Sequence, residues 1–205
     1  MSDKLVKREE FNNYNLILLE RNGAHILFLA ISINFEFEDT AGQTWSTAGK
    51  QKFMQGWERA IESKWNSSNL YTSPKKGAVA FRVNVIPFLE NSAATSKWTL
   101  TISKIKPGGF ATSSVSDGFV WNSSVGDSED LNPVSKGGSM GQRAAVHEFG
   151  HMIGLDDEYP DSALFPSWYP PANHTDTDSI MHSGEVIRVR HLAEFREWTK
   201  SALGE

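Results

Sequence analysis

The run HEFGH at residues 147–151 constrains the fold and chemistry of this chain more than any other feature. Its two histidines, His147 and His151, are four residues apart and so leave the same face of an α-helix, one turn from each other. Two imidazoles placed in this way suit a single tetrahedral Zn²⁺, which binds histidine nitrogens at about 2.0–2.1 Å. Glu148 lies beside the metal, where its carboxylate can take a proton from a bound water. The run therefore predicts a zinc-binding helix that carries a general base.

A catalytic zinc site needs a third protein ligand and an open position. Asp157 follows His147 by ten residues, and on a continuous helix it would lie about 15 Å further along the axis. The helix must therefore end between them, and Gly154 is placed to end it, because glycine adopts the left-handed conformation found at helix ends. We expect Asp157 to be the third ligand. Asp156 and Glu158 are the alternatives, with Asp157 then a residue of the helix end.

The sequence before the run predicts where this helix begins. Ser139 is followed three residues later by Gln142, which is the spacing of a capping box with Ser139 as the N-cap. Ala145, Phe149 and Met152 then recur on one face, and the two histidines lie on another. We expect a helix that starts after Ser139 and runs through the histidines.

The first half of the chain reads as strands around one helix. Apolar runs at residues 16–20 and 26–37 flank Asn22-Gly23, which is a strong hairpin signal. Large apolar residues then recur every fourth position within residues 44–65, which indicates an amphipathic helix. Further elements are strands at 78–89, 98–105 and 118–122, a Ser/Gly/Asp-rich loop to 138, and an amphipathic terminal helix carrying Leu192, Phe195, Trp198 and Ala202.

The composition limits the classes of protein and of metal ligand. With 205 residues and 39% hydrophobic residues, the chain is expected to form one domain over residues 16–205, preceded by an extension at 1–15. A formal net charge of −5 argues against nucleic acid and an anionic membrane surface as partners. There is no cysteine, so any metal must be held by His, Asp or Glu.

The start of the chain bears on its location. Residues 1–10 lack the apolar core and cleavage site of a signal peptide, and the longest apolar stretch, 26–37, is too short to span a bilayer. We expect a protein that is cytoplasmic as synthesised, with export left open to a route that uses no classical signal peptide.

Two motifs together resemble those of the metzincin family of zinc peptidases. Residues 147–157 resemble the extended metzincin motif, with Asp157 in place of the usual third histidine. The run SIMH at residues 179–182 is similar to the Met-turn of that family and closest to its astacin form. The run DEY at residues 157–159 is also similar to the Asp-Glu-Tyr that follows the zinc helix in bacterial IgA-type metallopeptidases.

The resemblance implies a fold and an activity. The fold would be α+β and metzincin-like, with a twisted mixed sheet, an early packing helix, the zinc helix, the Met-turn and a C-terminal helix. The activity would be that of a zinc-dependent endopeptidase acting on a protein or peptide, with Glu148 as the general base. Met181 would form a hydrophobic floor beneath the metal ligands. Ser183 stands where astacins place a tyrosine, and Tyr159 is a candidate substitute for stabilising the oxyanion.

Some expectations have alternatives. Phe119, Val120 and Trp121 are candidates for an edge strand that binds an extended substrate, and equally for a strand that fills the core. A zinc-stabilised binding or structural domain without catalysis is the main alternative to the peptidase. A second alternative is an exported bacterial protease toxin or effector.

Overall fold

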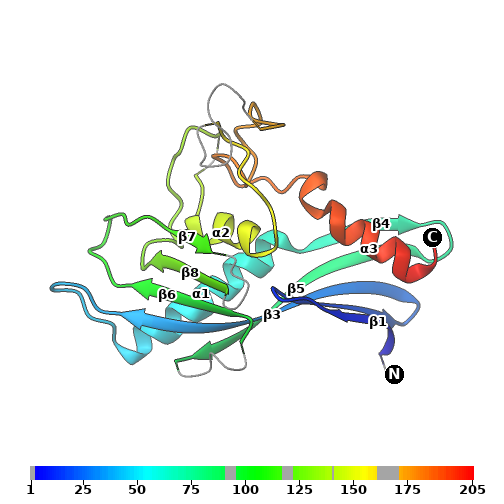
Figure 1. Ribbon diagram of the computed structural model, residues 1–205, viewed down its shortest axis with the longest axis horizontal. Helices are drawn as coiled ribbons and strands as arrows, with labels where there is room; N and C mark the ends of the chain where they lie inside the picture. Colours follow the sequence, from blue (N-terminus) through cyan, green and yellow to red (C-terminus); the bar gives the residue numbers. More distant parts are fainter. Residues whose placement is uncertain (1–2, 91–95, 117–121, 140, 161–170) are drawn as a thin grey trace.

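A twisted mixed sheet of eight strands organises the parts of the chain that the computed structural model describes, residues 3–90, 96–116, 122–139, 141–160 and 171–205 (Figure 1). The strands are β1 (Lys4–Glu10), β2 (Asn15–Arg21), β3 (Ala24–Glu38), β4 (Ser67–Ser73), β5 (Gly77–Leu89), β6 (Trp98–Ser103), β7 (Ser114–Ser116) and β8 (Asn122–Asp127). The helices are α1 (Thr47–Trp65), α2 (Ala144–Met152) and α3 (Ala193–Leu203), with a short 3₁₀ turn η1 (Val189–Leu192) before α3. The predicted α+β class and the twisted mixed sheet are confirmed.

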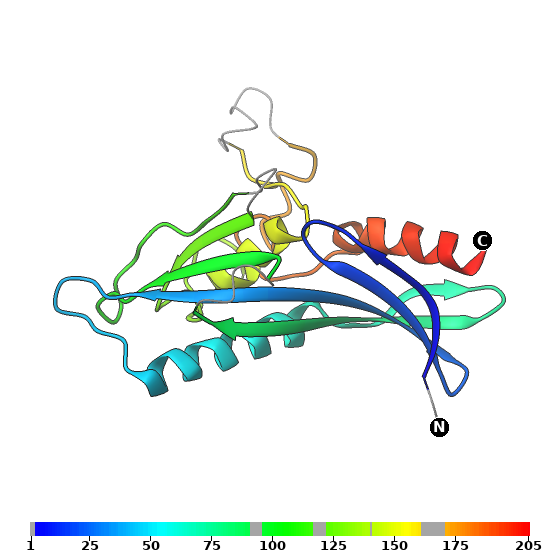
Figure 2. The same cartoon turned by 60° about the horizontal axis from the view of Figure 1, so that its bottom comes forward.

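The long strand β3 joins two halves of the sheet. Along one edge, β3 pairs first with antiparallel β2 and then, further along, with parallel β6. Its other edge pairs with parallel β5, to which β4 adds antiparallel. The sheet therefore carries the β1–β2 hairpin at one end and β6, β8 and β7 at the other (Figure 2).

The hairpin between β2 and β3 turns at the predicted Asn22 and Gly23. Both residues have positive φ, 53° and 80°, as a two-residue type I′ turn requires. Arg21 and Ala24 form the last pair of the ladder before the turn. The turn chemistry of these two residues fixes the register in which β2 pairs with β3.

Helix α1 forms over the predicted segment because of its cap and its apolar face. The Ser46 side chain accepts a hydrogen bond from the Gly49 backbone N–H at 3.0 Å, so the helix begins at Thr47. Trp57 and Trp65 are buried on the predicted face, and their rings pack against Phe149 of α2 with centroids 6.1 and 5.5 Å away. The apolar face of α1 thus supports the helix that carries the two histidines.

Strand β8 corrects the sequence prediction for the Ser/Gly/Asp-rich segment. Residues 122–127 form a strand parallel to β6, although a loop was predicted to cover residues 123–138. The prediction was wrong because the inward side chains of this strand are polar and are satisfied by hydrogen bonds. Ser124 donates to the Ser114 carbonyl at 3.0 Å, and Asp127 accepts the Ala111 N–H at 2.8 Å. Of the strand predicted at 118–122, only Asn122 is described, and it begins β8.

The two ends of the described chain pack on the sheet. Residues 1–15 were expected to form an extension, and within them β1 pairs with β2. The terminal helix was predicted correctly as α3, which lies alongside β4 and stacks Phe195 on Phe81 of β5 (Figure 1). Among the described residues, no helix combines the length and the apolar character needed to cross a membrane.

Candidate metal centre

Helix α2 begins later than predicted, and the predicted capping box is wrong. Its N-cap is Arg143, whose backbone N–H donates to the Glu185 carboxylate at 2.8 Å. Gln142 cannot be helical because its backbone pairs with Val134 in an isolated bridge. Ser139 instead donates its backbone N–H to Asp178 at 2.8 Å. Tertiary partners, which the local pattern does not contain, therefore decide where this helix starts.

Three side-chain atoms meet at the C-terminal end of α2. The Nε2 atoms of His147 and His151 are 3.2 Å apart, and Asp157 Oδ1 lies 3.3 and 3.2 Å from them. Ligands about 2.0–2.1 Å from a tetrahedral zinc lie about 3.3–3.4 Å from one another. The spacing of the three atoms therefore fits three corners of a tetrahedral metal site, and the three residues could hold a metal ion.

Backbone carbonyls fix which nitrogen of each histidine faces the site. His147 Nδ1 lies 2.7 Å from the Ile180 carbonyl, and His151 Nδ1 lies 2.7 Å from the Leu155 carbonyl. A carbonyl only accepts, so each Nδ1 carries a hydrogen, and in the neutral ring each Nε2 then presents a lone pair. Asp157 Oδ1 is buried and accepts no hydrogen bond from the described residues. Three acceptors thus face one another, an arrangement that a cation would satisfy.

The charges of the centre are coupled. Burial raises the pKa of Asp157, but hydrogen bonds and charge from His147 and His151, in the forms of these rings that carry a proton on Nε2, outweigh it and hold the pKa well below its ordinary range. Burial lowers the pKa of His151, but the Asp157 carboxylate and the Leu155 carbonyl outweigh it and raise the pKa. Glu148 has a raised pKa because burial is the largest influence on its carboxyl. The carboxylate among the ligands therefore stays ionised, while the neighbouring Glu148 holds a proton more readily.

Gly154 brings Asp157 back to the helix, as the sequence predicted. Its φ of +96° reverses the chain after α2, and the Leu155 N–H closes the end by donating to the Gly150 carbonyl at 3.0 Å. Of the three carboxylates considered as third ligand, Asp157 lies with the histidines. Asp156 is exposed, and Glu158 pairs with Arg190 instead.

Met181 packs directly under the HEFGH run of residues 147–151. It is buried, and a Cβ placed on Gly150 would overlap its sulfur. Gly150 lies between His147 and His151 in sequence, so Met181 contacts α2 on the segment that holds both ligands. The surrounding turn is closed by the Ser179 carbonyl, which accepts the N–H groups of His182 and Gly184 at 3.0 and 3.1 Å. The structure thus places Met181 where the sequence expected a hydrophobic floor.

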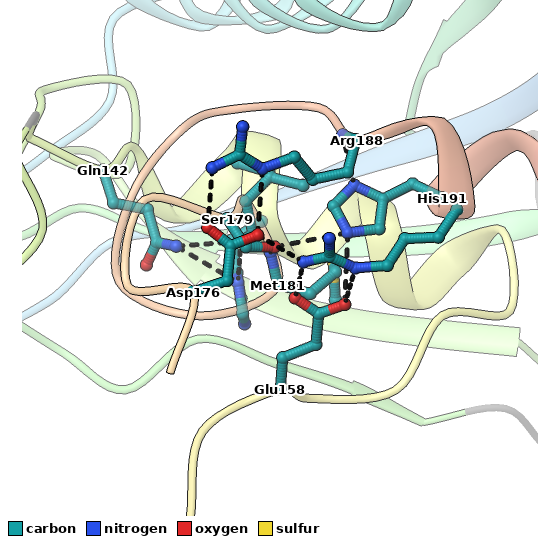
Figure 3. Close-up of polar contacts among 10 residues, drawn as sticks. Gln142, Glu158, Asp176, Ser179, Met181, Arg188 and His191 are labelled. Carbon is teal, nitrogen blue, oxygen red and sulfur yellow. Dashed lines mark hydrogen bonds and ion pairs between the residues drawn. The ribbon is translucent and has the colours of Figure 1, made fainter. Parts of the chain in front are cut away.

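Gln142 is a residue of the centre that sequence reasoning assigned only to a helix cap. Its amide nitrogen lies 2.9, 3.1 and 3.0 Å from the carbonyls of Ile180, His182 and Gly184, and Figure 3 shows the side chain directed at this turn. The Ile180 carbonyl is also the partner of His147. Gln142 therefore ties the turn to the first histidine, across a sequence separation that no local pattern reveals.

An open cleft of about 380 Å³ reaches the candidate metal centre at His147. Glu148 and His147 line it, together with Tyr159, whose ring stacks near the His147 ring with centroids 6.5 Å apart. Burial and the nearby Asp157 carboxylate raise the pKa of Tyr159, so its phenol remains a hydrogen-bond donor. A substrate in the cleft would meet the metal position, a carboxylate and a phenol.

The known proteins offer no parallel that decides between functions. No family model, no curated protein and no solved structure matched this chain. The centre is therefore interpreted from its own residues. The predicted substrate-strand residues Phe119, Val120 and Trp121 lie outside the residues that the structure describes, between β7 and β8.

Proposed function

We propose that the protein is a zinc-dependent endopeptidase with a metzincin-like fold. The observation that carries this proposal is the set of three side-chain atoms, 3.2–3.3 Å apart, whose member His147 lines a cleft together with Glu148. Zinc bound there would polarise a scissile carbonyl and activate a water, as it does in metallopeptidases. The two imidazoles and the carboxylate are ligand types that zinc accepts.

Glu148 is the proposed general base and acid. It lies next to His147 in sequence, and both line the cleft. From there its carboxylate can take a proton from the attacking water and deliver it to the leaving amine. The Tyr159 phenol is the proposed donor to the developing oxyanion, because it faces the same cleft and is protonated at neutral pH.

Three features support a metzincin-like assignment of the fold. Gly154 turns the chain so that a ligand returns to the zinc helix. Met181 packs beneath that helix from a tight turn. An early helix, α1, packs against α2 beside a mixed sheet. The residues that resemble metzincin motifs in sequence therefore also lie close together around α2, which supports the proposal.

The decisive experiment compares the wild-type protein with Glu148→Gln. The wild-type protein is expected to contain an equimolar amount of zinc and to cleave denatured protein substrates. Glu148→Gln should retain the metal and lose about 10²–10⁴-fold of the cleavage rate, since a positioned acid–base group contributes that much. Glu194→Gln, on the exposed face of α3, is the matched control and should cleave like the wild type.

The same comparison separates the alternatives. Full cleavage by Glu148→Gln would refute the assignment of the base. Zinc binding with no cleavage by either protein would favour a zinc-stabilised domain without catalysis. Iron in place of zinc would point to the non-haem iron chemistry that also uses two histidines and a carboxylate. Proteome-wide cleavage profiling, with Glu148→Gln as the background, would then identify substrates, including host proteins if the enzyme is an exported effector.

A further inference from the structure

A buried carboxylate follows the third metal-facing residue directly. Glu158 comes immediately after Asp157, and it accepts two hydrogen bonds from the Arg190 guanidinium, at 2.6 and 2.7 Å. Its backbone N–H donates to the Met181 carbonyl at 2.8 Å. Glu158 is therefore held through both its side chain and its backbone, one residue away from the candidate ligand.

Arg190 is itself held by a wider set of charges. Its guanidinium also reaches Asp176 at 2.6 Å, and Asp176 accepts two further hydrogen bonds from Arg188, at 2.9 and 2.6 Å (Figure 3). His191, which is buried, lies 3.4 Å from the Glu158 carboxylate. These contacts connect the segment after α2 with the entry to α3, and none of these five residues lines the cleft beside Glu148.

The segment that carries Asp157 has little structure of its own. Residues 155–158 belong to no helix or strand, so their conformation is not set by a regular hydrogen-bond pattern. The Leu155 N–H is fixed on Gly150 at one side of Asp157, and Glu158 is fixed on Arg190 and Met181 at the other. Two parallel hydrogen bonds between a guanidinium and a carboxylate also fix the orientation of the carboxylate, which a single hydrogen bond does not. The contacts of Glu158 thus reduce the conformational freedom that Asp157 would lose on binding a metal.

We propose that Glu158 and Arg190 form a clamp that positions Asp157 and thereby sets the affinity of the centre for metal. Both are positioning residues, because they act through Asp157. The inference rests on the proposed metal centre and does not depend on peptide cleavage. It assigns a role to an ion pair that the proposed chemistry leaves unused.

Metal affinity and a spectroscopic signature test the clamp. The dissociation constant for Zn²⁺ would be measured by competition with a chromophoric chelator, and the visible absorption of the Co²⁺-loaded protein would report the ligand geometry. Glu158→Gln and Arg190→Gln should weaken zinc binding by about 10–100-fold, the usual cost of losing a group that orients a metal ligand, and should alter the cobalt spectrum. Arg190→Lys keeps the charge but loses the two-pronged geometry, so its affinity should fall between those of Arg190→Gln and the wild type.

Arg188→Gln is the matched control. It removes a pair of hydrogen bonds to Asp176 of the same kind, yet Asp176 keeps Arg190, and Arg190 keeps Glu158. Its zinc affinity and cobalt spectrum should therefore stay close to those of the wild type. A merely structural role of the network would instead lower the melting temperature of all these variants without separating their affinities.

The outcomes are distinguishable from those of the peptidase proposal. Folded Glu158→Gln and Arg190→Gln proteins with wild-type affinity and cobalt spectrum would overturn the clamp, whatever the cleavage assay shows. If Glu158→Gln fails to fold, an unchanged affinity of Arg190→Lys would overturn it equally. A wild-type protein that binds zinc but cleaves no peptide would defeat the proposed function and leave the clamp standing. A wild-type protein that binds no metal would defeat both.

Discussion

Each histidine of the centre owes its orientation to a carbonyl from a different part of the chain. His151 uses Leu155, four residues further on, whereas His147 uses Ile180 in the turn that also supplies Met181. The turn therefore contributes twice to the centre, once by packing and once by a hydrogen bond. Loss of its conformation would release the His147 ring from the orientation in which Nε2 faces the other ligands.

Residue-level prediction succeeded where spacing alone sets the geometry. The histidine pair was found because residues four apart on a helix are neighbours. Asp157 could not be separated from Asp156 and Glu158 in sequence, because the path of the chain after Gly154 decides which carboxylate turns inward. The contacts of Gln142 with the turn were missed because their partners lie 38 to 42 residues away.

The choice of third ligand is testable with two matched substitutions. Asp157→Asn should weaken zinc binding by more than the 10–100-fold typical of groups outside the ligand set, since it removes the charged ligand itself. Asp156→Asn changes an exposed neighbour with the same chemistry and should leave the zinc affinity unchanged. Chelator competition measures both constants. Equal losses in the two variants, or a loss confined to Asp156→Asn, would show that Asp157 is not the ligand.

At the scale of the element, α2 needs two glycines for two different reasons. Gly150 leaves room for Met181, because a Cβ there would overlap the sulfur atom. Gly154 has open space around it, and glycine is required there because the backbone φ is +96°. The second reason is local and was predicted from the sequence. The first depends on a residue far along the chain and was not.

Substitutions of Gly154 should measure the cost of backbone strain, because no neighbouring atom would contact an added side chain at Cβ. Gly154→Ala should lower the free energy of unfolding of the metal-free protein by about 1–3 kcal/mol, the cost of a side chain at this φ. Gly154→Asn should cost less, because asparagine tolerates the left-handed region. Denaturant unfolding gives both values. Alanine and asparagine variants as stable as the wild type would mean that the chain can leave α2 by another route.

Other elements show the same division between local and distant causes. The hairpin at Asn22-Gly23 and helix α1 were predicted because turn chemistry and apolar periodicity are contained in a few residues. Strand β8 was taken for a loop because its inward side chains are polar and find partners only in the folded sheet. The start of α2 was misplaced because Gln142 pairs with Val134.

At the scale of the whole molecule, the order of elements predicted the α+β class, but not the way in which β3 divides the sheet. One edge of β3 pairs first with β2 and then with β6, and no sequence pattern within β3 indicates where the partner changes. The three candidate ligands lie beyond this framework, in α2 and the irregular segment that follows it. The sheet supports the centre through α1 and α2, and none of its described residues belongs to the candidate ligand cluster.

Because the sheet forms without the candidate ligands, removal of the metal should leave the fold intact. It should lower the free energy of unfolding only by the free energy of metal binding. At a free zinc concentration about 100 times the dissociation constant, binding adds about 2.7 kcal/mol to the stability of the folded state. For a chain of this size, that corresponds to a melting temperature about 5–10 °C higher than that of the metal-free protein. Thermal scans with zinc and with a chelator measure the shift. Asp157→Asn should show a much smaller one, and an unchanged wild-type melting temperature would contradict a metal site.

The position of the sheet in the chain has a consequence for synthesis. The eight strands that the structure describes all end by Asp127, and His147, the first candidate ligand, comes later. As the chain leaves the ribosome, the strands can pair before any part of the metal centre has emerged, since chains are made from the N-terminus. The nascent protein would thus present a paired sheet to which the last third of the chain adds the candidate metal centre. A chain cut short after Asp127 would therefore keep every described strand and lack all three candidate ligands.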